Sequence, residues 1–282
     1  MCFFISCIIL AIFAQKKTDS VKISKVVDAL ERFAPLPLQE GYDNAGLQVG
    51  LTEVEVSGAL LCLDVNEQII DEAIEKGCNL VIAHHPLIFH KLSCVSNLDY
   101  VQRAVMKAIQ NGITILAMHT NFDNAFGGVN FKIAEKLGLT DVEFLGEQHQ
   151  FDDVSYASGI VGNLPNSLTS VEFIDLLKRT FSVKCVQCNQ LLQRKINKVA
   201  LCGGAGSFLL DDAINVGADA FVTGEMSYHE YFGHEQEIQI AVIGHYQSEQ
   251  FTNEIFKSII KRECEGVPCF LAETNTNPIV YM

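Results

Sequence analysis

Basic residues are scarce in this sequence. Its 282 residues include 20 Lys and Arg against 34 Asp and Glu, which gives a formal net charge of −14 at pH 7. Proteins that bind duplex DNA hold its phosphates with clustered Lys and Arg, so this balance argues against such a surface. A local basic patch stays compatible with the composition, but nucleic acid is the least expected partner.

A membrane-spanning run is missing from the start of the chain. The apolar stretch from Met1 to Ala14 is too short to cross a membrane, and it lacks the positively charged segment that opens a clear signal peptide. A signal peptide remains one interpretation. We favour the other, in which residues 1–20 extend outside the fold, ahead of a cytoplasmic domain that starts near Val21. We expect no membrane association.

A disulfide framework is also missing. The ten cysteines are scattered through strand-like and helix-like runs, at positions such as Cys62, Cys78 and Cys202, where a small thiol is an ordinary core residue. Cys185 and Cys188 have the C-x-x-C spacing of redox and zinc sites, but no second pair and no nearby His accompany them. We favour a structural role for this pair and a reducing compartment for the protein.

Apolar strand-like and helix-like segments alternate along the chain. The hydrophobic content of 49% is enough for a large core. A helical pattern covers 23–33, and apolar runs at 59–63, 80–83 and 113–118 are separated by helical patterns at 66–77 and 101–111. Continuous apolar strands linked by helices indicate a parallel sheet covered on both faces, so the predicted fold class is α/β.

Part of this pattern occurs twice. Residues 61–77 align without a gap on residues 201–217 at an offset of 140, and the same register carries His85 onto Glu225. A second offset, 126, superposes the pair His119 and Asp123 on the pair His245 and Glu249. Both alignments follow the same order along the chain and predict a duplicated strand-helix-strand unit.

The segment between the two copies has a pattern of its own. We expect residues 151–198 to form a peripheral α+β insertion, with strands at 155–161 and 183–186, a turn at 162–165 and a helix at 170–180. After the next predicted strand, the glycine-rich run 203–207 opens a helix and could hold a phosphate with its backbone N–H groups, although no P-loop sequence follows it.

Imidazoles and carboxylates follow the predicted strands. Ligand sites of open α/β sheets lie at the carboxyl ends of strands, so these side chains should gather at one place. In the repeated His-x-x-x-Asp/Glu pattern, positions i and i+4 of a helix share one face and can reach one ion. The candidates are His84, His85, His119, Asp123, Glu225, His245 and Glu249.

These candidates outnumber the three or four protein ligands of a single ion. Mixed imidazole and carboxylate ligands suit Zn, Fe, Mn, Co or Ni, and two such ions about 3.5 to 4 Å apart would favour hydrolysis. A His after a strand is also often a hydrogen-bonded loop residue. The repeated pattern favours ligand roles for Asp123, His245 and Glu249, and it leaves His119 and Glu225 open.

Separated motifs lie at residues 42–50, 84–89, 119–123, 222–225 and 244–249. Together, between Val21 and Pro278, they resemble the GTP cyclohydrolase I type 2-like family, also called the NGG-one-interacting factor three family. The resemblance implies two similar, interlocked α/β domains with a dinuclear metal site between them, and a toroidal homohexamer. It also implies a short form that lacks a central insertion of some members.

By the same resemblance, five residues correspond to the family's metal ligands, and Glu249 corresponds to the bridging carboxylate. The ligands are His84, His85, Asp123, His245 and Glu249. The implied domains are 21–128 plus 242–282 for the first and 129–241 for the second, which would contain the insertion 151–198. The resemblance also implies a GTP cyclohydrolase activity, although the sequence shows no purine-reading motif.

Two functions are compatible with these residues. The first is a metal-dependent hydrolase of a nucleotide-like or cyclic amide or phosphate substrate, in which Glu225 or the pair Tyr228-His229 acts as the acid or base. The second is a non-catalytic metal-binding scaffold or regulatory partner whose ions are structural, with closed coordination that resists chelation. The first predicts that removal of the metal abolishes activity.

Overall fold

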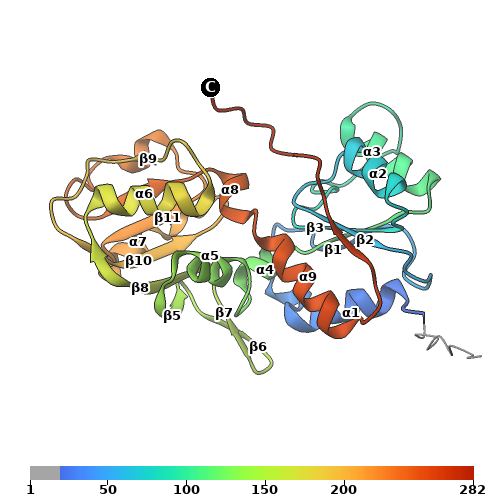
Figure 1. The fold of residues 1–282 in the computed structure, drawn as a ribbon, viewed down its shortest axis with the longest axis horizontal. Coiled ribbons are helices and arrows are strands. Elements are labelled where there is room, and N and C mark those ends of the chain that lie inside the picture. The colour runs from blue at the N-terminus through green and yellow to red at the C-terminus, as the bar shows by residue number, and fades with distance from the viewer. Residues whose placement is uncertain (1–19) are drawn as a thin grey trace, which may run out of the picture.

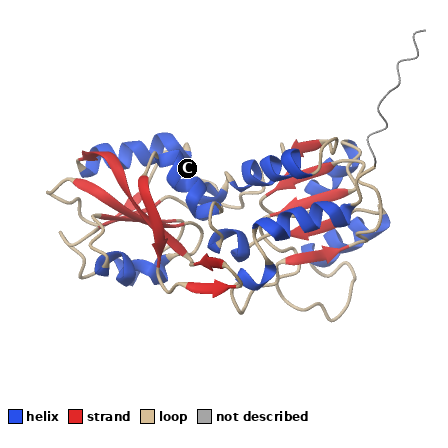
Figure 2. Ribbon diagram, turned by 90° about the horizontal axis from the view of Figure 1, so that it is seen from below, coloured by secondary structure: helices blue, strands red, loops and turns tan. Residues whose placement is uncertain are grey.

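The computed structural model describes residues 20–282, so the expectation for the extension 1–20 falls almost entirely outside the described residues. Two α/β domains lie next to each other, each built around its own sheet (Figure 1). Strands occupy the middle of each domain and helices flank them, as the view from below shows (Figure 2). In the described part of the chain, no helix combines the length and the apolar character that a membrane crossing requires.

The first domain contains a five-stranded sheet in the order β1-β4-β3-β2-β13. Strands β13, β2, β3 and β4 run parallel, and β1 is antiparallel to β4. Every residue of β2, β3 and β4 is buried, which explains their continuous apolar sequences. The strands span Gly46–Val49 (β1), Ala59–Cys62 (β2), Leu80–Ala83 (β3), Thr114–Ala117 (β4) and Cys269–Leu271 (β13).

Helices cover both faces of this first sheet (Figure 1). Alternate strand residues point to opposite faces, so Leu60 and Val81 pack with α2 and α3 while Leu61 and Ile82 pack with α1 and α9. These helices span Ile23–Phe33 (α1), Glu67–Glu75 (α2), Tyr100–Gln110 (α3) and Thr252–Glu263 (α9). A single turn of 3₁₀ helix, η1 (Leu36–Leu38), follows α1.

The second domain contains a six-stranded sheet in the order β5-β8-β10-β11-β12-β9. Strands β10, β11 and β12 run parallel, and β5, β8 and β9 are antiparallel to their neighbours. The strands span Thr140–Leu145 (β5), Gly159–Leu168 (β8), Gln187–Cys188 (β9), Ile196–Cys202 (β10), Ala220–Thr223 (β11) and Gln239–Val242 (β12). A separate hairpin pairs β6 (His149–Phe151) with β7 (Val154–Tyr156).

Helices also cover this second sheet. Buried side chains of α5 and α6 belong to the large core that includes Val199 and Leu201, while those of α7 pack with Ala200 and Phe221 on the other face. The helices span Val129–Leu137 (α5), Ser170–Phe181 (α6) and Leu210–Asn215 (α7), with 3₁₀ turns at Ser207–Leu209 (η2) and Tyr228–Tyr231 (η3). Two short helices, α4 (Thr120–Asn124) and α8 (His245–Glu249), follow β4 and β12.

The two domains share the predicted duplicated unit. Helix α2 covers residues 67–75 and the combined η2 and α7 cover 207–215, an offset of 140 that the strands β3 and β11 also keep. The parallel strands that correspond between the two copies occur in the same order in both sheets, β4-β3-β2 and β12-β11-β10. The α/β fold class and the two similar domains are therefore confirmed.

The expectation of a peripheral insertion at 151–198 is not what the second sheet shows. Strand β8 lies inside the sheet, between β5 and β10, and the predicted turn at 162–165 falls within this strand. Gly162 pairs with Val199, and Pro165 falls in an irregular stretch between the paired residues Asn163 and Leu168. Tertiary pairing on both sides thus overrides the local turn signal of Gly and Pro.

The chain crosses between the domains more than once. Strand β12 ends at Val242 in the second sheet, and the segment after it returns to the first domain, where α9 packs against α1 and β13 pairs with β2. The residues that follow β3, β4 and β12 consequently meet between the domains, where Figure 1 shows the two short helices α4 and α8. The exact domain limits at 128/129 and 241/242 stay a prediction.

Candidate metal centre

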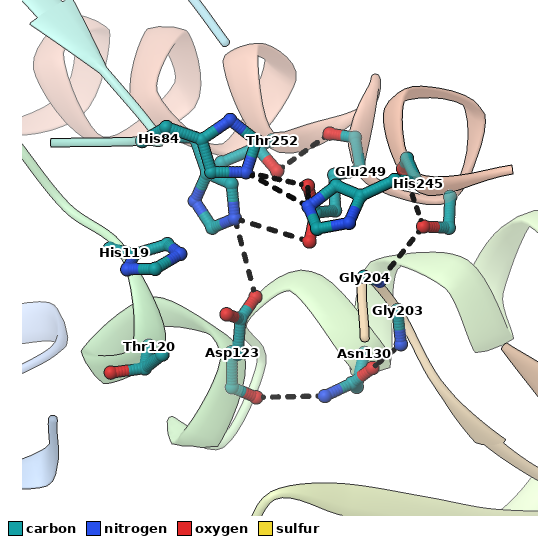
Figure 3. Close-up of polar contacts among 12 residues, drawn as sticks. His84, His119, Thr120, Asp123, Asn130, Gly203, Gly204, His245, Glu249 and Thr252 are labelled. Atoms are coloured by element: carbon teal, nitrogen blue, oxygen red, sulfur yellow. Dashed lines mark hydrogen bonds and ion pairs between the residues drawn. The ribbon is translucent and has the colours of Figure 1, made fainter. Parts of the chain in front are cut away.

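Histidines and carboxylates that follow strands of both sheets meet at the ends of these strands. His84 and His85 directly follow β3, and Asp123 lies on α4 after β4. On α8, His245 and Glu249 are four residues apart and therefore lie on one face of the helix. Figure 3 shows the side chains of His84 and Asp123 directed toward those of α8 from the other side of the site.

The distances place the inner nitrogen and oxygen atoms within reach of shared ions. His84 Nε2 lies 3.6 Å from Asp123 Oδ1 and 3.7 Å from Glu249 Oε1. His85 Nε2 and His245 Nε2 lie 3.0 and 3.2 Å from Glu249 Oε2, and 3.2 Å from each other. Glu249 thus belongs to two groups of potential ligands at once, one with His84 and Asp123, the other with His85 and His245.

The outer nitrogen of each imidazole after β3 is held by an acceptor. His84 Nδ1 donates to the carbonyl oxygen of Met118 at 2.9 Å, and His85 Nδ1 donates to Asp64 Oδ1 at 2.8 Å. An acceptor at Nδ1 requires the proton there, so the lone pair of Nε2 in the neutral ring faces the centre of the site. Such partners fix the ring and the tautomer of a ligating histidine.

The same arrangement holds for the other two histidines. His119 Nδ1 donates to Asp43 Oδ1 at 2.8 Å, and His245 Nδ1 donates to Glu225 Oε1 at 3.0 Å. His119 also belongs to a group of potential ligands with His84 and His85. The ring of His119, which the sequence left open between ligand and loop residue, therefore has its outer nitrogen occupied and stands at the edge of the cluster.

While the rings are neutral and carry their proton on Nδ1, two atoms at the centre are buried without a hydrogen-bond donor from the described residues. They are His84 Nε2 and Glu249 Oε2, and the two residues are 0% and 3% exposed. A buried polar atom without a partner costs free energy, and a carboxylate costs more than a neutral group. A cation would satisfy both atoms, so the donor set and its burial fit a metal of the Zn, Fe, Mn, Co or Ni type.

The electrostatics of the metal-free site also favour a cation. Burial raises the pKa of Glu249, but the charges of His84 and His85 outweigh it and hold this pKa well below its usual range. Burial and the negative charge of Glu249 raise the pKa of Asp123 well above its usual range. Burial lowers the pKa of His85, but Glu249 and Asp64 outweigh it and raise this pKa to about 10. Protons therefore occupy positions that a metal ion would take.

The loop at Gly203 and Gly204 brings the backbone of the second domain against Glu249. A Cβ atom on Gly204 would lie 2.3 Å from Glu249 Oε1, and the φ angle of Gly204 is +60°. The N–H groups of Gly203 and Gly204 donate to Asn130 Oδ1 and Ser248 Oγ, at 2.8 and 2.9 Å. Because both groups are already used, close packing accounts for these glycines better than the phosphate site that the sequence suggested.

The expected acid or base residues lie on the second-domain side. Glu225 is exposed and holds His245. His229 is on η3, where its ring lies 5.2 Å from that of Tyr228 and 6.2 Å from that of Phe232, between centroids. A catalytic role for either residue stays a prediction, as does the ligand role of the five residues singled out by resemblance.

Two cavities flank the cluster. One has a volume of about 570 Å³ and is lined by Glu225, His245 and Tyr281 among others. The second has a volume of about 200 Å³ and is lined by His119 and Glu249 among others. A small molecule could therefore approach from either side of the residues that would hold the ions.

The sequence did not single out two of the carboxylates that orient the histidines, Asp43 and Asp64. Asp43 lies in a loop whose Asp, Asn and Gly residues suit a tight turn, and Asp64 follows β2 at the same sheet edge as His85. Burial raises the pKa of Asp43, but hydrogen bonds from His119 and Thr120 outweigh it and lower this pKa to about 2. The position of Asp64 at the carboxyl end of a strand was the one signal that could have identified it.

Two α/β domains that join imidazoles and carboxylates at their strand ends define a class of candidate metal-binding proteins. The chain belongs to the Duf34/NIF3 (NGG1p interacting factor 3) family, whose model matches residues 21–278. The resemblance inferred from the sequence motifs is thereby confirmed.

Relatives support this assignment over most of the chain. A "GTP cyclohydrolase 1 type 2 homolog" of Clostridium perfringens is 34% identical over 230 residues, covering 81% of this chain and 87% of the relative. One of Lactococcus lactis is 32% identical over 265 residues, covering 92% and 98%. The crystal structure of a Staphylococcus aureus hypothetical protein superposes with a TM-score of 0.85 at 27% identity, covering 94% of this chain and 100% of that chain.

Proposed function

We propose that this protein binds two divalent transition-metal ions and is a metal-dependent hydrolase. The observation that carries the proposal is the position of Glu249, whose two carboxylate oxygens face different groups of imidazoles. A carboxylate shared in this way is suited to bridge the ions of a two-metal site.

The chain offers a set of ligands to each ion. One ion would be held by His84, Asp123 and Oε1 of Glu249. The other would be held by His85, His245 and Oε2 of Glu249. When bound, such ions activate a water molecule and polarise the group under attack. The held Nδ1 atoms keep the rings oriented before any ion arrives.

The residues around the ligands would handle the substrate. Glu225 lines the larger cavity and is exposed, so its carboxylate can exchange protons with a substrate there while it orients His245. His229 is the second candidate acid or base. We propose a nucleotide-like or cyclic amide or phosphate substrate, in line with the cyclohydrolase label of the relatives.

The family resemblance also underlies two broader proposals, a homohexamer and a cytoplasmic location. The eight cysteines within the described residues are all free, which agrees with a reducing compartment. Sedimentation of the purified protein would show whether the chain assembles as a hexamer.

Elemental analysis and a substrate screen test the function. The purified chain should contain about two transition-metal ions per chain, and it should hydrolyse a nucleotide or cyclic amide only until a chelator removes them. Glu249→Gln should abolish turnover. His234→Ala is a matched control, because His234 pairs with Glu237 near the surface and belongs to none of the ligand groups.

The outcomes separate the two functions. Full turnover by the metal-free protein or by Glu249→Gln would refute the hydrolase. Ions that resist the chelator until the protein unfolds, without turnover of any substrate in the screen, would favour the non-catalytic scaffold.

A further inference from the structure

The segment after β13 runs from the first domain toward the candidate metal centre. The N–H group of Ala272 donates to the carbonyl oxygen of Leu61 at 2.9 Å, which continues the pairing of β13 with β2. The segment then leaves the carboxyl end of β2, as the dark red trace in Figure 1 shows. Further along, Ile279 and Tyr281 line the larger cavity together with His245.

A buried carboxylate fixes the start of this segment. Glu72, on α2, is 8% exposed. Its Oε1 accepts from the N–H of Glu273 at 2.8 Å, and its Oε2 accepts from the N–H of Thr274 at 3.0 Å. Two hydrogen bonds from consecutive backbone groups to one carboxylate hold the chain in a defined position just before Thr276.

Thr276 contacts the carboxylate that orients His85. Its Oγ1 donates to Asp64 Oδ2 at 2.8 Å, while Asp64 Oδ1 accepts from His85 Nδ1 at 2.8 Å. With one oxygen bound by a hydroxyl and the other by an imidazole, the Asp64 carboxylate has a fixed orientation. His85 Nε2, on the far side of the ring, lies 3.0 Å from Glu249.

A second aspartate in the site also accepts one hydrogen bond from a threonine hydroxyl and one from a histidine. Thr120 Oγ1 donates to Asp43 Oδ2, and His119 Nδ1 donates to Asp43 Oδ1. Thr120 follows His119 directly in the sequence, whereas Thr276 comes from a segment far along the chain from both Asp64 and His85. Two threonine-aspartate-histidine connections built from unrelated parts of the chain indicate a requirement of the site for fixed carboxylates.

We propose that Thr276 is a positioning residue of the metal centre, acting through Asp64 on the ring of His85. The segment 272–281 is thereby a part of the site. This inference rests on the metal binding proposed above. Without the hydroxyl, the Asp64 carboxylate can rotate, and the ligand group of His85, His245 and Glu249 should hold its ion less tightly. No hydrogen bond joins Thr276 to His84 or Asp123 in the described structure, so the group of His84, Asp123 and Glu249 should keep its affinity.

Cobalt titration of matched variants tests the proposal. Thr276→Val removes the hydroxyl at nearly constant volume, and Thr276→Ser retains it. Loss of a group that hydrogen-bonds a ligand typically weakens metal binding by about 10- to 100-fold. Thr276 acts one step further out, through Asp64, so we expect a loss near the lower end, about tenfold, for one of the two Co²⁺ ions in Thr276→Val, with an altered visible spectrum. Thr276→Ser should restore both. Thr140→Val, the same change at an exposed position of β5 whose hydroxyl contacts only Asp141 and Asn163 among residues 20–282, should leave both ions unaffected.

A double-mutant comparison identifies the route of the effect. In an Asp64→Ala background, Thr276→Val should cause no further loss of affinity, because the residue through which it acts is already gone. Full additivity of the two changes would contradict the proposed route.

The outcomes distinguish this inference from the proposed function. If the unaltered protein binds no Co²⁺, the metal-binding proposal fails. If it binds two ions and Thr276→Val binds them equally well, or if Thr276→Ser loses as much as Thr276→Val, the role of Thr276 is wrong while the metal centre stands. If Thr276→Val does not fold, Thr276→Ser still tests the role of the hydroxyl through its Co²⁺ titration and the ring NMR signals of His85. Because serine keeps the hydroxyl, a changed His85 tautomer in the folded serine variant would contradict the proposal.

Discussion

The two copies of the duplicated unit supply different chemistry from the same backbone. After β3 the first copy has His84 and His85, and after β11 the second has Gly224 and Glu225 at the same register. The copies also differ after the preceding strand, where Asp64 after β2 corresponds to Gly204 after β10. The first copy therefore provides two imidazoles and an orienting carboxylate, while the second provides glycines and the carboxylate that holds the histidine of α8.

Close packing explains this difference. A Cβ atom on Gly224 would lie 2.6 Å from the carbonyl oxygen of Gly204 and 2.8 Å from Ser248 Oγ, so this position has no space for a side chain. The space is filled by α8, whose Glu249 has one more methylene than Asp123, its counterpart on α4. A duplicated unit can thus supply one asymmetric site, because one copy places its ligands on the strand end and the other makes room for the helix that carries the shared carboxylate.

The largest expected effect concerns the two short helices. Glu249→Gln should remove both ions, reducing the metal content from about two ions per chain to nearly none, whereas Asp123→Asn should remove about one. The reason is that Glu249 faces both groups and Asp123 faces one. Elemental analysis after dialysis measures the number of metal ions bound per chain. Equal losses in the two variants would show that the helices are equivalent.

The next effect compares the two orienting carboxylates of the duplicated unit. Asp64→Asn and Glu225→Gln should each lower the affinity for one ion by about 10- to 100-fold, and the loss in Asp64→Asn should be nearer the upper end. The side chain of Glu225 is 56% exposed and that of Asp64 is 37% exposed, so water replaces the carboxylate of Glu225 more easily. Competition with a chelating dye measures both constants. A larger loss in Glu225→Gln would reverse this ranking of the two copies.

The pH dependence of metal binding should follow the protonation of His85. The pKa of His85 is about 10 in the metal-free protein, so near pH 7 an ion must displace its proton, and affinity should rise by about tenfold per pH unit for each proton released. Calorimetry in buffers of different ionisation enthalpy counts these protons. Uptake without proton release at pH 7 would show that His85 is neutral there.

The metal-free protein should show the opposite trend in stability. Because the pKa of His85 is raised in the fold, its contribution is complete below the usual histidine value of about 6.5 and is lost as pH rises through about 10. Chemical denaturation of the metal-free protein between these pH values measures this loss, and His85→Gln should flatten it.

The smallest effect tests the equivalence of the two copies away from the site. Gly77 and Gly217 have φ angles of +68° and +70°, and a Cβ atom on either meets nothing within 4 Å. Gly77→Ala and Gly217→Ala should therefore each cost about 1 to 2 kcal/mol of unfolding free energy, from backbone strain alone. Denaturant titration of the metal-free variants measures both values. A clearly larger cost in one copy would mean that the two turns are not equivalent.

Much of the fold could be predicted from the sequence because it rests on local patterns. Helix α1 occupies the predicted residues 23–33, and the strands β2, β3 and β4 lie within the apolar runs. The failure at β8 has a physical reason: Gly162 and Pro165 favour a turn locally, yet β5 and β10 pair with this strand on both sides. Hydrogen bonds to distant strands outweighed the turn preference, and no nearby residue indicates them.

By itself, the sequence determined the α/β class, the duplication and the strand-end histidines and carboxylates, because these follow from periodicity and from spacing along one chain. The tertiary structure alone decided that Asp43, Asp64 and Glu225 hold the histidine rings and that Thr276 reaches Asp64. Such partners come from separate segments, and their meeting depends on the crossing of the chain between two domains rather than on any local preference.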